Sequence, residues 1–200
     1  MPANSPEHMQ DSIGHAIRLP SLTILLTMTM VAIGCGGGDS STAAPVAAPA
    51  EPAALTGVTA AHNQVRAKVG VAPLVWNTAL AATAQAWADA GTDSQAPAGL
   101  LDHNPNRSNG FSYAVGENIF GSSGAITGPE AVAIWAAEAD HYDHATNTCT
   151  SGAGCSHYTQ VVWAASHEFG CGIAHRTTLS YGYTVVCNYG PAGNGGGRPY

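Results

Sequence analysis

Four of the five cysteines lie in the last third of this 200-residue chain, and their spacing constrains the fold more than any other feature. The segments FGCGIAHR and YGYTVVCNY predict two strands joined by the turn TTLS. A hairpin centred on Leu179 places Cys171 directly opposite Cys187, at a separation that a disulfide bridges with little adjustment. Cys149 and Cys155 would then close the short loop CTSGAGC. Four cysteines allow three pairings, and a metal site is the alternative, but these spacings are not those of a CxxC zinc module.

An apolar segment near the start of the chain predicts export. Residues 19–34, LPSLTILLTMTMVAIG, are uncharged and follow Arg18. A helix that spans a bilayer takes about 20 residues, so this segment is short for a permanent anchor. We therefore predict a signal peptide over residues 1–34. Glu7 is unusual in the first part of such a peptide, which leaves Met9 as an alternative start.

The residue that follows this segment is Cys35, the fifth cysteine. VAIGC resembles the lipobox of bacterial lipoproteins, although Ala32 stands where that motif usually has Leu. It predicts a lipid-anchored Cys35 on an exported face, periplasmic or extracellular. The alternative is an ordinary signal peptide and a secreted protein. Residues 35–57 are rich in Gly, Ala, Ser and Pro and predict a flexible tether. An exported chain meets oxidising conditions, in which disulfides persist.

Composition narrows the class of the remaining domain, residues 58–200. The formal net charge is −7, and the six Lys and Arg residues are scattered, so nucleic acid is not an expected partner. Charged residues make up 10% of the chain and hydrophobic residues 45%, much of this Ala. Such a composition predicts a globular domain whose helices pack through small side chains.

Apolar periodicity and capping residues predict four helices. They are AHNQVRAKVG after a cap at Thr56 or Thr59, NTALAATAQAWADA, PEAVAIWAAEADHY and HYTQVVWA. VAPLVW is predicted as a loop and SYAVGENIFG as a short strand. The predicted fold is α+β, a three-layer α-β-α sandwich with a small antiparallel sheet between helices.

In this order the segments resemble the CAP superfamily of cysteine-rich secretory, antigen 5 and pathogenesis-related proteins. GENIF is similar to the family's Gly-Glu-Asn segment, HYTQVVWAAS to its first signature and VVCNYGPAGN to most of its second. Departures are small: Ser156 precedes His157 where a charged residue or Gly is usual, and Thr184 and Gly195 are atypical in the second signature. The resemblance implies the same two disulfides and covers the chain from residue 58 onward.

One carboxylate is expected on a buried helix face. In the third predicted helix Ala131, Ile134, Trp135 and Glu138 share one face by the i, i+3, i+4, i+7 rule. Glutamate is rarely buried without a partner. We therefore expect Glu138 either to border a wet cleft or to meet a cationic group.

The family resemblance implies that this cleft is lined by His103, Glu117, Glu138 and His157. Two imidazoles suit a divalent cation such as zinc, with His103 and His157 as ligands and the glutamates as outer acceptors or as a general base. The alternative is a hydrogen-bonded network that only positions three elements. His141, one turn beyond Glu138, is an alternative to His103.

Other candidates are interpreted as structural. His62 is expected to be a structural residue near the start of the first helix, and three further histidines to lie on loops or strand surfaces: His144, His167 and His175. The four Trp residues are expected in the core. Ser112 and Ser166 lack the GxSxG context of a hydrolase nucleophile.

Three functions stay open at this point. The leading one is non-enzymatic: an exported module that binds a divalent cation and a lipid-like ligand such as a sterol or fatty acid, as the family's members variously do. The second is a metal-dependent hydrolase or protease with Glu117 or Glu138 as base. The third is a cell-surface module that binds a protein partner without using the cleft.

Overall fold

The structure is a computed structural model that describes residues 50–95 and 98–200. The predicted signal peptide, the lipidation site Cys35 and most of the predicted tether lie outside the described residues. No helix within the described ranges has the length and apolar character that crossing a bilayer takes.

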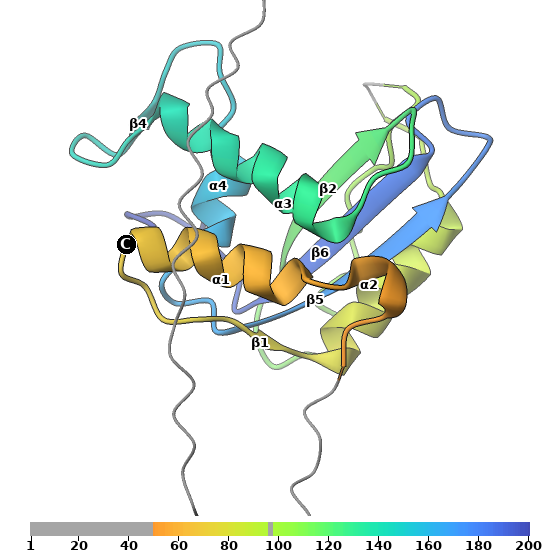
Figure 1. Cartoon of the computed structure of the whole chain (residues 1–200), viewed down its shortest axis with the longest axis horizontal. Helices are drawn as coiled ribbons and strands as arrows, with labels where there is room; N and C mark the ends of the chain where they lie inside the picture. Colours follow the sequence, from red (N-terminus) through yellow and green to blue (C-terminus); the bar gives the residue numbers. More distant parts are fainter. Residues whose placement is uncertain (1–49, 96–97) are drawn as a thin grey trace, which may run out of the picture. The chain divides into compact units, whose positions relative to one another are not determined.

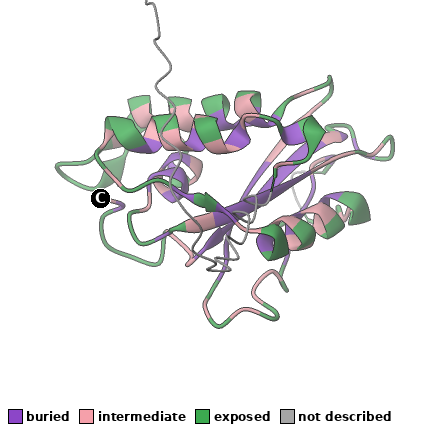
Figure 2. Ribbon diagram, turned by 60° about the horizontal axis from the view of Figure 1, so that its bottom comes forward, coloured by how far each residue is buried: buried purple, intermediate pink, exposed green. Residues whose placement is uncertain are grey.

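The domain places helices on both faces of a sheet, as Figures 1 and 2 show. α2 covers one face, and α1, α3 and α4 cover the other. This is the α+β sandwich that the sequence predicts. In chain order the elements are η1 (Ala53–Leu55), α1 (Val58–Lys68), β1 (Val75–Trp76), α2 (Thr78–Ala90), β2 (Gly116–Ser122), α3 (Gly128–Ala137), η2 (Glu138–His141), β3 (Tyr142–Asp143), β4 (Thr148–Cys149), α4 (Ser156–Val161), β5 (Glu168–His175) and β6 (Tyr183–Gly190).

The main sheet has the strand order β1-β5-β6-β2. β5 and β6 form the predicted hairpin, in which Cys171 pairs with Cys187 and is bridged to it. The second disulfide joins Cys149 to Cys155. Both bridges are those that the sequence predicts.

The sheet is not purely antiparallel, because β1 adds a parallel edge strand where the sequence predicts a loop. Val75 N–H donates to His167 O at 2.9 Å, and Asn77 N–H donates to Phe169 O at 2.7 Å. A two-residue strand has too little alternation to be recognised from its sequence. β1 is a strand only because its backbone pairs with β5, which lies about 90 residues further along the chain.

Glycine lets α2 lie directly on β5. A Cβ on Gly170 would come within 2.3 Å of Ala81 N, and one on Gly172 within 2.3 Å of Gln85 Cα. The Gln85 carboxamide in turn bonds both backbone groups of Ile173, at 2.9 and 3.0 Å. Small residues on the helix and the strand therefore set the thickness of this layer.

The opposite face of the sheet carries the larger core, where α1 and α3 meet. Ala131 and Trp135 are buried as predicted. Ile134 is 44% exposed, so its assignment to the buried face was wrong. α3 contacts the domain along a narrower stripe than the periodicity indicates, and Ile134 lies beside that stripe.

Folded structure begins earlier than the predicted boundary at residue 58. η1 lies within the segment assigned to the tether, and Leu55 is fully buried in the core. The cap of α1 also differs from the prediction of Thr56 or Thr59. Gly57 is the N-cap residue, and the Glu51 carboxylate accepts from Gly57 N–H at 2.7 Å and Thr59 N–H at 2.6 Å.

A buried arginine ties α1 to the end of α4. Arg66 is fully buried and donates to the carbonyls of Ala72, Val161, Trp163 and Ser166 at 2.7 to 3.0 Å. Burial lowers the pKa of Arg66 to about 10. The guanidinium donates to carbonyls at the end of α4 and in the loop after it that have no helical N–H partner. Arg66 therefore fixes the C-terminal end of α4 against α1.

Candidate functional site

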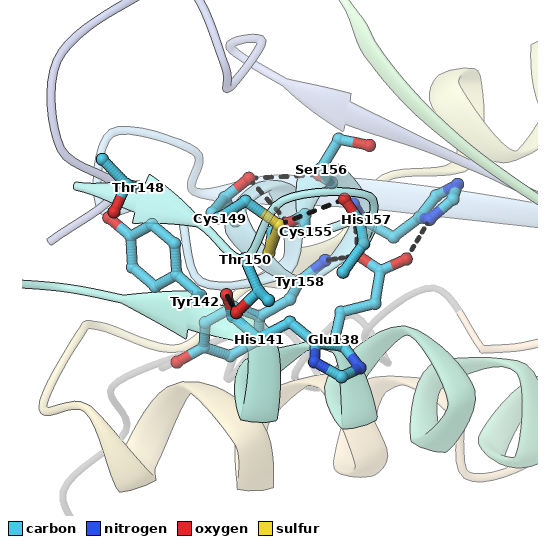
Figure 3. The surroundings of a disulfide bond; sticks show 12 residues. Glu138, His141, Tyr142, Thr148, Cys149, Thr150, Cys155, Ser156, His157 and Tyr158 are labelled. Carbon is cyan, nitrogen blue, oxygen red and sulfur yellow. Dashed lines mark hydrogen bonds and ion pairs between the residues drawn. A yellow bond between two sulfur atoms is a disulfide. The ribbon is translucent and has the colours of Figure 1, made fainter.

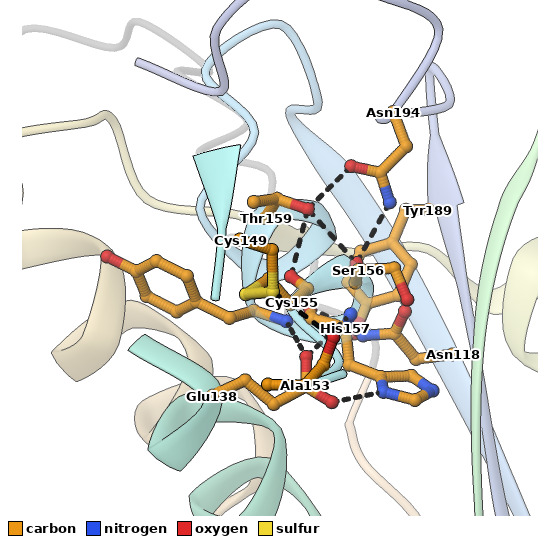
Figure 4. Close-up of polar contacts among 11 residues, drawn as sticks. Asn118, Glu138, Cys149, Ala153, Cys155, Ser156, His157, Thr159, Tyr189 and Asn194 are labelled. Carbon is orange, nitrogen blue, oxygen red and sulfur yellow. Dashed lines mark hydrogen bonds and ion pairs between the residues drawn. A yellow bond between two sulfur atoms is a disulfide. The ribbon is translucent and has the colours of Figure 1, made fainter. Parts of the chain in front are cut away.

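Glu138 joins the end of α3 to the start of α4. Its Oε1 accepts from His157 Nδ1 at 2.6 Å, and its Oε2 accepts the backbone N–H groups of His157 at 3.0 Å and Tyr158 at 3.1 Å (Figure 4). The N-cap residue of α4, Cys155, makes no side-chain cap bond. A carboxylate from another helix therefore caps α4 and orients the histidine in its first turn.

The Cys149–Cys155 disulfide lies beside this pair (Figure 3). It fixes the loop immediately before α4, and hence the point at which the chain turns toward His157. The imidazole of His157 stacks on the indole of Trp135, with ring centroids 6.2 Å apart and planes inclined by 19°. His157 is therefore held by a carboxylate, an aromatic ring and a helix start.

Glu117 forms the second pair, on the edge strand β2. Its Oε1 accepts from His103 Nδ1 at 2.7 Å and from Asn104 N–H at 2.9 Å. The Glu117 side chain is fully buried, whereas that of His103 is 60% exposed. The carboxylate thus holds a histidine that lies on the loop between α2 and β2.

Both histidines line one cleft. A cavity of about 250 Å³ contains His103, Glu117 and His157 among its lining residues, and a neighbouring hollow of about 260 Å³ shares both histidines. Glu138 does not line either cavity but lies behind His157. The structure thus brings together the four residues that the sequence singled out, as two histidine-carboxylate pairs. His141 is exposed and lines neither cavity, so His103 occupies this position.

The hydrogen bonds determine what the imidazoles present to the cleft. In each pair the carboxylate accepts, so Nδ1 carries the proton and Nε2 of a neutral ring keeps its lone pair. This is the usual arrangement of a metal-ligating histidine with a carboxylate behind it. Within the described ranges no group of three or more His, Cys, Asp or Glu side chains converges on one point. The site is an open one with two candidate ligands.

Three polar residues support the site without having been predicted. Asn118, the residue after Glu117, donates from Nδ2 to His157 O at 3.0 Å. Gln160 packs against Gly116, where a Cβ would come within 2.1 Å of its Oε1. Arg107 lines the cavity and donates to the carbonyls of Val115 and Asn104 at 2.8 Å. Successive side chains of a strand point to opposite faces, so Glu117 and Asn118 lie on different faces of β2. This alternation in GENIF is the sequence signal that could have assigned them separate roles.

Glu117 also has a buried polar neighbour across the sheet. Glu117 pairs in register with Asn188 of β6. Oε2 of Glu117 and both polar atoms of the Asn188 carboxamide are buried without a hydrogen-bond partner among the described residues. Opposed side chains on one face of a sheet lie about 4.5 to 5.5 Å apart, so these groups form one polar cluster behind the cleft.

The histidines interpreted as structural lie outside the cleft. His62 is fully buried, with Nδ1 at 2.9 Å from Val58 O and Nε2 at 2.8 Å from Tyr189 Oη. Burial lowers the pKa of His62 to about 4. The exposed His144 and His175 stack on tyrosine rings, and His167 is exposed.

The fold and the site define a disulfide-stabilised α-β-α domain with a two-histidine cleft, and comparison with known proteins gives its family. The profile of the Cysteine-rich secretory protein family, CAP, matches residues 59–189, and the chain belongs to this family. Pathogenesis-related protein 1A of Nicotiana tabacum is 45% identical over 142 residues, which cover 70% of this chain and 77% of the relative. Pathogenesis-related leaf protein 6 of Solanum lycopersicum is 41% identical over 143 residues, which cover 70% and 80%.

Solved structures show the same fold. Venom allergen-like protein 4 of Schistosoma mansoni superposes with a TM-score of 0.60 at 26% identity, covering 74% of this chain and 94% of that one. A structure of NaASP2 with Zn²⁺ superposes with a TM-score of 0.52 at 23% identity, covering 72% and 82%. The chain is therefore a CAP-domain protein of the pathogenesis-related 1 type.

Proposed function

We propose that this protein is a binding module that holds a divalent cation, zinc by preference, through Nε2 of His103 and His157. The observation that carries the proposal is that each Nδ1 is bonded to a carboxylate, at 2.7 and 2.6 Å, while both rings line one cavity. The carboxylates hold the orientation of the imidazoles. A related CAP structure, that of NaASP2, was solved with Zn²⁺.

Two histidines make a weak site whose remaining positions are open to water or to a ligand. A cation there would supply Lewis acidity and a binding point for an anionic group, while the chain orients the imidazoles. We expect binding to weaken in acid, because a proton on Nε2 competes with the cation for the same lone pair.

Calorimetric titration of zinc into the apo protein tests this proposal. We expect one site per chain, and a loss of about tenfold or more in affinity for His103→Ala and for His157→Ala, since each removes one of two ligands. His167→Ala is the matched control, because His167 is an exposed histidine outside the cleft. No binding by the wild type, or an equal loss in the control, would contradict the proposal.

A groove between α1 and α3 favours a second ligand, a fatty acid. The cavity of about 430 Å³ is lined mainly by Ala, Val and Pro side chains, and its two polar residues are Gln64 and Lys68. An alkyl chain fits the apolar lining, and its carboxylate would meet Lys68. We expect displacement of a fluorescent fatty acid by palmitate, and its loss in Val65→Trp, which fills the groove. A sterol that competes equally well would argue against the fatty-acid assignment.

We also propose that the protein is exported and tethered through a lipid on Cys35. The support is the apolar segment before Cys35, the two disulfides of the domain, and a family whose description is secretory. Mass spectrometry of the mature protein should find a diacylglycerol-modified Cys35 as its first residue. An unmodified start further along the chain would contradict the anchor and leave a secreted protein.

A further inference from the structure

β2 is an edge strand with a free side along the cleft. Its residues pair in register with β6, and no other strand of the described chain pairs with it. An unpaired edge presents a row of N–H and C=O groups that can pair with another chain. Which residues supply that row follows from the hydrogen bonds on the opposite side of the sheet.

Two contacts on the far edge establish the alternation. Phe169 O accepts from Asn77 N–H, and both backbone groups of Ile173 bond Gln85, so the odd-numbered residues of β5 point away from β6. Neighbouring residues of a strand point to opposite edges. The even-numbered residues of β5 therefore bond β6, and with the observed registers the even-numbered residues of β2 do so too.

The outer edge of β2 is thus formed by Glu117, Ile119 and Gly121. None of their backbone N–H and C=O groups has a hydrogen-bond partner within residues 50–95 and 98–200. The unpaired row from Glu117 to Gly121 is about 14 Å long, since each of its four steps along a strand is about 3.4 Å.

This edge is recessed, which limits what can reach it. Ile119 is only 7% exposed and Asn118 only 2%. The two hollows that share His103 and His157 lie along it, one reaching from Gly116 to Asn118 and the other including Ile119. The loop before His103 forms one wall and His157 stands on the other. Walls on both sides of the edge favour a single extended chain as the occupant over the broader sheet edge of a second copy.

The groove also has two chemically distinct ends. Leu100 and Leu101 line the end at Ile119. Arg107 lines the other end. Its Nε and Nη1 donate to the carbonyls of Val115 and Asn104, and its positive charge has no carboxylate partner among the described residues. The carboxylates of the lining already have partners: Glu117 bonds His103, and Asp102 accepts from Ser94 and Gln95.

We propose that this edge groove, formed by the outer backbone of β2 between Leu100–His103 and His157, binds an extended peptide as an additional strand. The peptide's backbone pairs with Glu117, Ile119 and Gly121. An apolar side chain of the peptide lies against Leu100 and Leu101, and a carboxylate lies near Arg107. Backbone pairing supplies affinity in this mode of recognition, and the pockets for alternate side chains supply specificity.

The test uses the mature full-length protein, stripped with EDTA so that the result does not depend on a bound cation. A phage-displayed library of random heptapeptides is selected on it, and an enriched peptide is synthesised. Amide hydrogen exchange by NMR then compares free and bound protein. We expect exchange at Ile119 and Gly121 to slow at least about tenfold on binding, while the already paired amides of Asn118 and Phe120 change little.

The matched control is made in the peptide. N-methylation of a peptide nitrogen that faces β2 should weaken binding about tenfold or more, because it removes a hydrogen bond and adds a clash, while methylation of the next nitrogen along should leave binding intact. Failure to enrich any peptide, enriched peptides that leave the Ile119 and Gly121 amides unprotected, or dimerisation through this edge would overturn the proposal. Peptide binding by a protein that binds no zinc would remove the metal proposal and leave this one standing.

Discussion

The two histidine-carboxylate pairs of the cleft have similar hydrogen bonds but different supports. Glu138 bonds His157 and also caps α4, so this pair is part of the packing between two helices. Glu117 bonds His103, which lies on a loop with its side chain 60% exposed, compared with 34% for His157. The Glu138–His157 pair is therefore part of the packing of two helices, whereas the Glu117–His103 pair joins a strand to an exposed loop. The difference indicates that His157 is held more firmly than His103.

The largest expected effect comes from removing the shared carboxylate of the first pair. Glu138→Ala should lower the free energy of unfolding by about 3 kcal/mol, because α4 loses its cap and His157 loses a charge-assisted hydrogen bond. Glu138→Gln keeps one acceptor oxygen for the helix and should cost about half as much. Urea denaturation measures both. A loss within about 0.5 kcal/mol for the alanine variant would remove the structural role assigned to this pair.

His62, which lies outside the cleft, should make the free energy of unfolding depend on pH. Its pKa is lowered by burial to about 4, so between pH 6.5 and 4 the unfolded chain binds a proton that the folded chain does not. Stability due to this group is fully present above the unfolded pKa and is lost as the pH falls. From pH 6.5 to 5 the loss should be about 1.5 kcal/mol, because the unfolded group is half protonated at pH 6.5 and almost fully protonated at pH 5.

Urea denaturation as a function of pH checks this loss, with His62→Phe as the control. The phenyl ring keeps the aromatic packing but cannot titrate, so the variant should be less stable and have a shallower pH dependence in this window. An unchanged slope would show that His62 does not cause the loss of stability in this pH window.

The smallest effect is expected at the loop histidine. His103→Ala should change the free energy of unfolding by about 1 kcal/mol or less, because its ring is mostly exposed and water can replace it beside Glu117. The same variant should still lose zinc affinity. If His103→Ala and Glu138→Ala lowered the free energy of unfolding equally in urea, both pairs would be structural. The difference between the two pairs described above would then be wrong.

Much of the fold could be predicted because its signals are local. The hairpin centre at Leu179 predicted the Cys171–Cys187 register, and the helical periodicity predicted that Trp135 would be buried. The same reasoning was wrong for Ile134, because periodicity gives the direction of a side chain but not the width of the partner surface. It also missed β1, which is a strand only because β5 lies beside it.

The sequence by itself determined which side chains each element carries and toward which of its faces they point, since these depend on local backbone geometry. Only the tertiary structure decided which carboxylate meets which histidine, that Glu138 caps a helix 18 residues further along, and that His62 is sealed from the cleft. Those outcomes depend on contacts between segments far apart in the chain. Their formation is governed by how whole layers pack, and no short segment contains that information.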